Sequence, residues 1–106
     1  MQVNILGQEY SYEEIKASDD IKMGDGDGYC DGYGKIIRIN NDYASNHPTC
    51  ISDLEGYKRQ VRRHEIIHAF FHESGLEKYC SDEIMVDWIA RQFPKITKVF
   101  QQVGAL

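Results

Sequence analysis

The first half of the chain alternates short apolar runs with turn residues, whereas the second half spaces its apolar residues as helices do. QVNIL (2–6) predicts a strand, and GQEYSYEEI (7–15) predicts a turn that leads into an extended or mixed segment. The run KIIRIN, Lys35–Asn40, carries the β-branched residues typical of a strand. With Tyr29 and Cys30 on the other side of the DGYG turn, it predicts a hairpin.

Two helices are predicted at residues 51–75 and 81–102, which hold hardly any glycine or proline before their ends. The expected boundaries are Ser52 or Thr49 as the first cap, Gly75 as the first end, and Ser81, Asp82 and Glu83 as the second start. The intervening NNDYASNHPT predicts a loop. Strands therefore precede two helices, in a chain of 106 residues that suits a single domain.

The stretch RRHEIIHAFFHESG (62–75) holds three of the four histidines, inside the first predicted helix. His64 and His68 are one turn apart, about 40° around the axis and about 6 Å along it, so their imidazoles can converge on one metal ion. Glu65 lies about 60° from His68, where it can reach a water that the ion activates rather than the ion itself. This HExxH spacing predicts a zinc site with Glu65 as the general base.

His72 and Glu73 follow on the same predicted helix. His72 lies about 12 Å from His64 along the axis, so the two cannot share an ion while the helix continues. The metzincin spacing HExxHxxGxxH is excluded, because Phe71 and Ser74 occupy the positions of its glycine and third histidine. His72 is expected either to end the helix near its dipole or to contact substrate. Glu73 points about 180° from His64 and is expected to be solvated.

A third ligand is expected from the second predicted helix, in SDEIMVDWIA (81–90). Glu83 and Asp87 are four residues apart and therefore share a helical face. Asp87 stands among apolar residues, where a carboxylate needs a partner. Ligating histidines usually donate their other ring N–H to such a carboxylate. We therefore expect Glu83 to bind the ion and Asp87 to orient one of the two histidines.

Composition narrows the functions that this motif could serve. A net charge of −5 and a pI near 5.3 argue against direct binding to nucleic acid, which usually requires a basic face. No apolar run approaches the roughly 18 residues of a membrane span, and the first residues lack the features of a secretory signal. The three cysteines, Cys30, Cys50 and Cys80, form no CxxC and are expected to be reduced thiols. A cytoplasmic protein is therefore expected.

HExxH on one helix and ExxxD on the next resemble the gluzincin pattern of metallopeptidases. Over roughly residues 25–100, the chain resembles the small, phage-associated zinc peptidases of the ImmA/IrrE-like type, through Gly28–Asp31, Lys35–Ile39, RRHEIIHAFFHESGL and EIMVDWIARQFPKI. This resemblance implies one zinc ion per chain, held by His64, His68 and Glu83, with Glu65 as the general base. For a further donor to the transition state, the candidates are Tyr79, His72 and His47.

The architecture implied by this resemblance is α+β and zincin-like, in one domain over residues 1–106. A small, mostly antiparallel sheet would pack on the HExxH helix, and the ExxxD helix would complete the site. The resemblance also implies a cleft between that helix and an edge strand, expected at Lys35–Asn40, to which an extended peptide or protein substrate would pair. The implied function is the hydrolysis of peptide bonds by a water that zinc activates.

A second function stays open beside the peptidase. The chain could be a zinc-stabilised binding or regulatory module of a mobile genetic element, with a regulatory protein as its partner and negligible turnover. Glu65 favours the enzyme, because a purely structural site has no use for a general base. A structural zinc is also usually closed by four protein ligands, whereas the sequence offers three.

Overall fold

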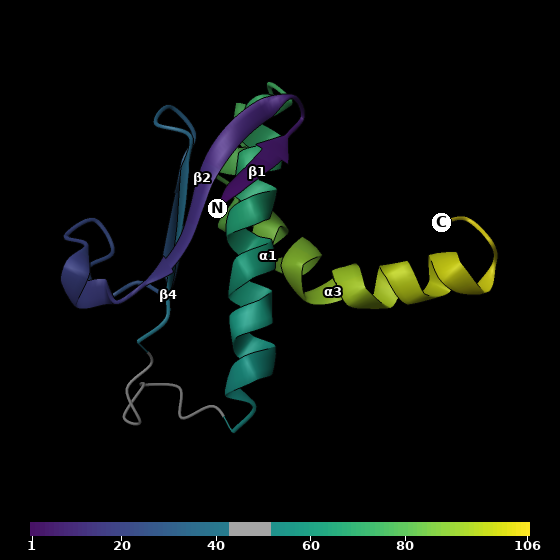
Figure 1. Ribbon diagram of the computed structural model, residues 1–106. Helices are drawn as coiled ribbons and strands as arrows, with labels where there is room; N and C mark the ends of the chain where they lie inside the picture. The colour runs from purple at the N-terminus through teal and green to yellow at the C-terminus, as the bar shows by residue number, and fades with distance from the viewer. Residues whose placement is uncertain (43–51) are drawn as a thin grey trace.

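A computed structural model describes residues 1–42 and 52–106 of the chain. The elements in chain order are β1 (Gln2–Ile5), β2 (Gln8–Ile15), the 3-10 turn η1 (Ala17–Asp19), β3 (Gly28–Asp31), β4 (Ile36–Asn40), α1 (Leu54–Glu73), α2 (Glu77–Cys80) and α3 (Glu83–Gln102). The strands form one sheet, α1 packs against it, and α3 runs away from α1 at a steep angle (Figure 1). The α+β class predicted from the sequence is confirmed.

The sheet is mixed, with the strand order β1-β2-β4-β3. β1 pairs with β2, and β3 with β4, in antiparallel hairpins, whereas β2 and β4 pair in parallel. The expectation that Lys35–Asn40 forms an edge strand is wrong, because β4 lies between β2 and β3. β4 buries Ile37 and Ile39 completely, and so apolar a strand is best placed where both of its edges are paired. The edge beside α1 is β3.

The sheet contains two antiparallel hairpins, β1–β2 and β3–β4. In the first, Leu6 and Gly7 form a two-residue loop with φ of 51° and 91°, the positive values that tight hairpin turns require. In the second, Cys30 pairs with Ile37, as the predicted hairpin requires. Of the extended or mixed segment predicted after Gly7, the structure shows the extended form, since Gln8–Ile15 is strand β2 throughout.

The hydrophobic core lies between the sheet and α1. It is built from the buried side chains of Ile5, Tyr10, Ile37, Ile39, Val61 and Ala69. Alternate residues of β4 supply two of these, because successive strand residues point to opposite faces. The same packing fixes the orientation of α1 around its axis, and thereby the direction in which the HExxH residues point.

The helix boundaries differ from the prediction by a few residues. Asp53, not Ser52, caps α1, and its carboxylate accepts a hydrogen bond from the Gly56 N–H over 2.9 Å. Gly75 follows the end of α1 with a φ of +75°, as expected of a glycine that stops a helix. Thr49, together with His47, Cys50 and most of the predicted loop, lies outside the described residues. None of the described helices combines the length and apolar character that a bilayer span requires.

Glu73 is the clearest departure from the sequence prediction, which placed it in solvent. Its side chain is only 11% exposed. Its carboxylate accepts a hydrogen bond from the Tyr10 hydroxyl over 2.7 Å and another from Lys35. The Lys35 ammonium and the Tyr10 hydroxyl hold the pKa of Glu73 below its usual range. The helical pattern pointed this residue away from His64 correctly, but that side of α1 packs against the sheet and is not open to water.

Candidate metal centre

His64 and His68 stand on adjacent turns of α1 and point the same way. Their Nε2 atoms are 3.2 Å apart, and both side chains are largely buried. Two ligands bound at 2.0–2.1 Å to a tetrahedral ion lie about 3.3 Å apart. The imidazole pair is therefore arranged as it would be around a zinc ion.

Glu83, the first residue of α3, brings a carboxylate to the two imidazoles. Oε2 lies 3.0 Å from His64 Nε2, and Oε1 lies 3.0 Å from His68 Nε2. One donor atom from each of the three side chains falls within 4.8 Å of the other two. Two nitrogens and one carboxylate oxygen are a donor set that suits zinc, and three ligands leave one tetrahedral position open.

The start of α3 separates Glu83 from its acidic neighbour Asp82. Asp82 is the N-cap of α3, and its carboxylate accepts a hydrogen bond from the Met85 N–H over 3.0 Å. That role orients Asp82 toward its own helix. The cap thereby leaves Glu83 as the residue that reaches α1.

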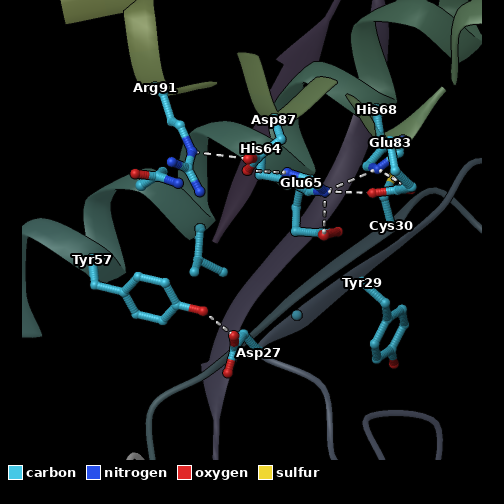
Figure 2. A pocket seen from close by; sticks show the side chains of 13 residues that line it. Asp27, Tyr29, Cys30, Tyr57, His64, Glu65, His68, Glu83, Asp87 and Arg91 are labelled. Carbon is cyan, nitrogen blue, oxygen red and sulfur yellow. Dashed lines mark hydrogen bonds and ion pairs between the residues drawn. The ribbon is translucent and has the colours of Figure 1, made fainter. Parts of the chain in front are cut away.

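Glu65 lies beside the cluster and outside its set of ligand atoms. Its Oε1 is 3.9 Å from His64 Nε2 (Figure 2), and the residue is 6% exposed. Burial, with a smaller contribution from the charges of Glu83 and Asp27, raises the pKa of Glu65 to about 8. A nearby cation would favour the charged form of this carboxylate.

Gly28 on β3 is what admits the Glu65 side chain. A Cβ at this position would lie 3.1 Å from Glu65 Cγ and 2.9 Å from the Arg38 carbonyl oxygen. A side chain at this position would therefore crowd the Glu65 side chain and collide with the backbone of β4. β3 and Glu65 therefore form one wall of the site together.

The Nδ1 atoms of the two imidazoles, which point away from the cluster of ligand atoms, lie near different partners. His64 Nδ1 lies 3.6 Å from Asp87 Oδ1, an ion-pair separation, while Asp87 Oδ2 accepts a hydrogen bond from Arg91 Nε over 2.9 Å. His68 Nδ1 lies 3.7 Å from Cys80 Sγ, and this thiol donates to the His68 carbonyl over 3.4 Å. The structure thus places Asp87 at His64, as one of the two predicted options, and adds Cys80 at His68.

Among the residues that the structure describes, those lining the cleft beside the cluster do not include His72 or Tyr79. His72 Nδ1 lies 2.5 Å from Glu77 Oε1, and its ring packs edge-on against Tyr33 with centroids 5.3 Å apart. Gly32 leaves the space for that ring, since a Cβ there would lie 2.5 Å from His72 Cγ. The His72 side chain therefore anchors the β3–β4 turn to α1.

A cleft of about 510 Å³ extends from the cluster along β3 and the first half of α1 (Figure 2). Sequence reasoning missed several of the residues that line it, among them Asp27, Tyr57, Gln60 and Arg91. The hydroxyl of Tyr57 donates a hydrogen bond to Asp27 across this cleft. Tyr57 lies seven residues before His64, and this two-turn spacing is the signal that could have placed it on the same face of α1.

The chain matches no profile of a known protein family, no curated protein and no solved structure.

Proposed function

We propose that this protein is a zinc-dependent peptidase that hydrolyses peptide bonds with Glu65 as the general base. The observation that carries the proposal is the position of Glu65, a buried carboxylate 3.9 Å from His64 Nε2 and outside the ligand atoms. A carboxylate so placed can hold and deprotonate a water without binding the ion itself. The resemblance of the HExxH and ExxxD motifs to gluzincins, and of the longer run to ImmA/IrrE-like peptidases, supports the same function.

In the proposed reaction, each side chain of the site has a separate role. His64, His68 and Glu83 would hold the zinc ion, and Asp87 and Cys80 would keep the imidazoles in orientation. Zinc, when bound, would polarise the scissile carbonyl and make a water easier to deprotonate. Glu65 would take the proton of the attacking water and pass it to the leaving amine. Its burial keeps bulk water from competing for that proton.

The substrate is proposed to be an extended peptide segment lying along β3. This strand is the sheet edge next to α1, and Gly28, Tyr29 and Cys30 line the cleft. An unpaired strand edge can take a further strand by backbone hydrogen bonds. The corrected edge therefore replaces Lys35–Asn40 as the proposed docking strand, and it leads the peptide past Glu65.

Cleavage of a peptide library by metal-free, zinc-loaded and chelator-treated protein tests this proposal. We expect cleavage only with zinc, lost on chelation and restored when zinc is returned. Mass spectrometry of the products identifies the cleavage sites, so the substrate does not have to be known in advance. The absence of zinc-dependent cleavage across the library would contradict the peptidase.

A zinc-stabilised binding module of a mobile genetic element is the second candidate. It is favoured by one observation, that the proposed ligands come from both α1 and α3, so zinc would tie the two helices together. X-ray absorption on the zinc-loaded protein separates the two candidates. Three protein ligands with one water-derived oxygen fit the peptidase, whereas a fourth protein ligand fits a closed structural site.

A further inference from the structure

The second half of α3 carries an apolar stripe that the rest of the described chain does not cover. The residues from 91 to 103, here called the α3 arm, extend away from the sheet and α1 (Figure 1). Phe93 is 50% exposed, Phe100 44% and Val103 72%. The radius of gyration is 14.6 Å, compared with about 13 Å for a compact chain of this length.

The residues of this stripe are here called the seam, and they begin where α3 is still buried in the fold. Alternating steps of three and four residues connect Val86, Ile89, Phe93, Ile96, Phe100 and Val103. This is the a/d spacing of helices that pack along their length. Val86, the first residue of the seam, is completely buried, whereas Phe93, Phe100 and Val103 further along are exposed.

The distribution of charge along the arm indicates what kind of surface the stripe would meet. The positions flanking the seam in the heptad are Ala90, Gln92, Thr97 and Val99, which are uncharged. The basic residues Arg91, Lys95 and Lys98 fall on the outer face. Two copies of the arm could therefore pack seam to seam without bringing like charges together.

We propose that the α3 arm is a self-association surface and that its occupant is the α3 arm of a second copy of this chain. All 17 aspartates and glutamates precede the arm, and the whole chain carries a net charge of −5. That charge disfavours the other surface to which a basic amphipathic helix binds, an anionic membrane. The proposal does not depend on zinc or on peptidase activity.

The size of the seam sets the expected strength of the dimer. Two phenylalanines per copy, each about half exposed, with their aliphatic neighbours would bury on the order of 1,000 Å² in total, the lower limit for a specific interface. A dissociation constant of about 10–100 μM is therefore expected. Association should be the same in chelator and in zinc.

Sedimentation equilibrium of the full chain from about 1 to 200 μM tests the proposal. Wild type should shift from monomer to dimer over this range. Phe100→Glu should weaken the dimer at least about tenfold, since it buries a charge in the seam. Val103→Asp should have the same effect, and Val103 lies beyond the last turn of α3, where a substitution does not threaten the fold.

Phe70→Glu is the matched control, because Phe70 is 41% exposed but lies on α1. This variant should dimerise as wild type does.

Two results would overturn this inference. One is a wild-type chain that stays monomeric at the highest concentration, or seam variants that dimerise unchanged. The other is co-sedimentation of wild type with phosphatidylglycerol vesicles that Phe100→Glu and Val103→Asp abolish, which would assign the stripe to a membrane surface.

Discussion

Arg63 on α1 donates a hydrogen bond from Nε to the backbone carbonyl of Ala90 on α3, over 2.6 Å. The residue that would normally donate to this carbonyl within the helix is Pro94, four positions later, which has no N–H. α1 therefore satisfies an acceptor that α3 cannot satisfy itself. The bond joins the two helices one residue before His64, and so it helps to hold Glu83 opposite the imidazoles.

Removing this bond should destabilise the protein by about 1–3 kcal/mol, since Arg63→Ala leaves a part-buried carbonyl without its donor. Pro94→Ala gives the carbonyl a helical partner, so the added cost of Arg63→Ala should largely disappear in the double variant. Urea unfolding in chelator measures this coupling. Arg59→Ala, an exposed arginine one turn earlier, is the control and should change stability by less than about 0.5 kcal/mol. Strictly additive effects would contradict the account.

Glu83→Gln should weaken zinc binding by at least about 100-fold, because an amide is neutral and a poor ligand for zinc. Competition with a chelator of known affinity measures the change. Asp82→Asn is the adjacent control, since asparagine also caps a helix and the Asp82 side chain faces its own helix. If both variants lost the same amount of zinc affinity, the negative charge at the start of α3 would account for the effect. Glu83 would then not be a zinc ligand.

His72→Ala should leave zinc at one ion per chain and lower the unfolding free energy. The His72 ring packs against Tyr33 and pairs with Glu77, so its loss loosens the β3–β4 turn, at a cost of about 1–3 kcal/mol. Metal analysis after dialysis, together with urea unfolding, checks both parts. A variant that purifies without metal, under conditions where wild type retains it, would place His72 in the metal site.

The ion pair between Glu14 and Arg62 should make stability depend on pH in the acid range. Arg62 Nε donates to Glu14 Oε2 over 2.7 Å, and this bond, more than any other contact, lowers the pKa of Glu14. A carboxyl whose pKa is lower in the folded state contributes stability that is complete above its unfolded pKa, about 4.3, and is lost as pH falls through the folded value.

Arg62→Gln should therefore cost about 1 kcal/mol at pH 7 and much less near pH 2. Denaturant unfolding at the two pH values measures the difference. Lys95→Gln, at an exposed position of α3, should show no such dependence. A cost of Arg62→Gln that is constant with pH would mean that the side chain stabilises by packing alone.

The parts of the structure that the sequence predicted are those set by local spacing. His64, His68 and Glu65 take their relative positions from the geometry of one helix, and the Tyr29–Cys30 hairpin follows from its turn. Glu83 was placed from its spacing to Asp87, again a property of one helix.

What the sequence did not reveal depends on contacts between distant segments. The burial of Glu73 requires Tyr10 and Lys35, which are 63 and 38 residues away. The interior position of β4 follows from its parallel pairing with β2, which no local pattern specifies. Cys80 reaches His68 only because α2 folds back against α1.

The most direct test of the peptidase is the cleavage rate of zinc-loaded Glu65→Gln. The amide keeps the size of the side chain but cannot accept the proton of the attacking water, so the rate should fall by about 10²–10⁴-fold while zinc content stays at wild type. Glu55→Gln, an exposed glutamate in the first turn of α1, should cleave at the wild-type rate. A folded, zinc-loaded Glu65→Gln protein that cleaves as fast as wild type would contradict the role of Glu65 and the mechanism with it.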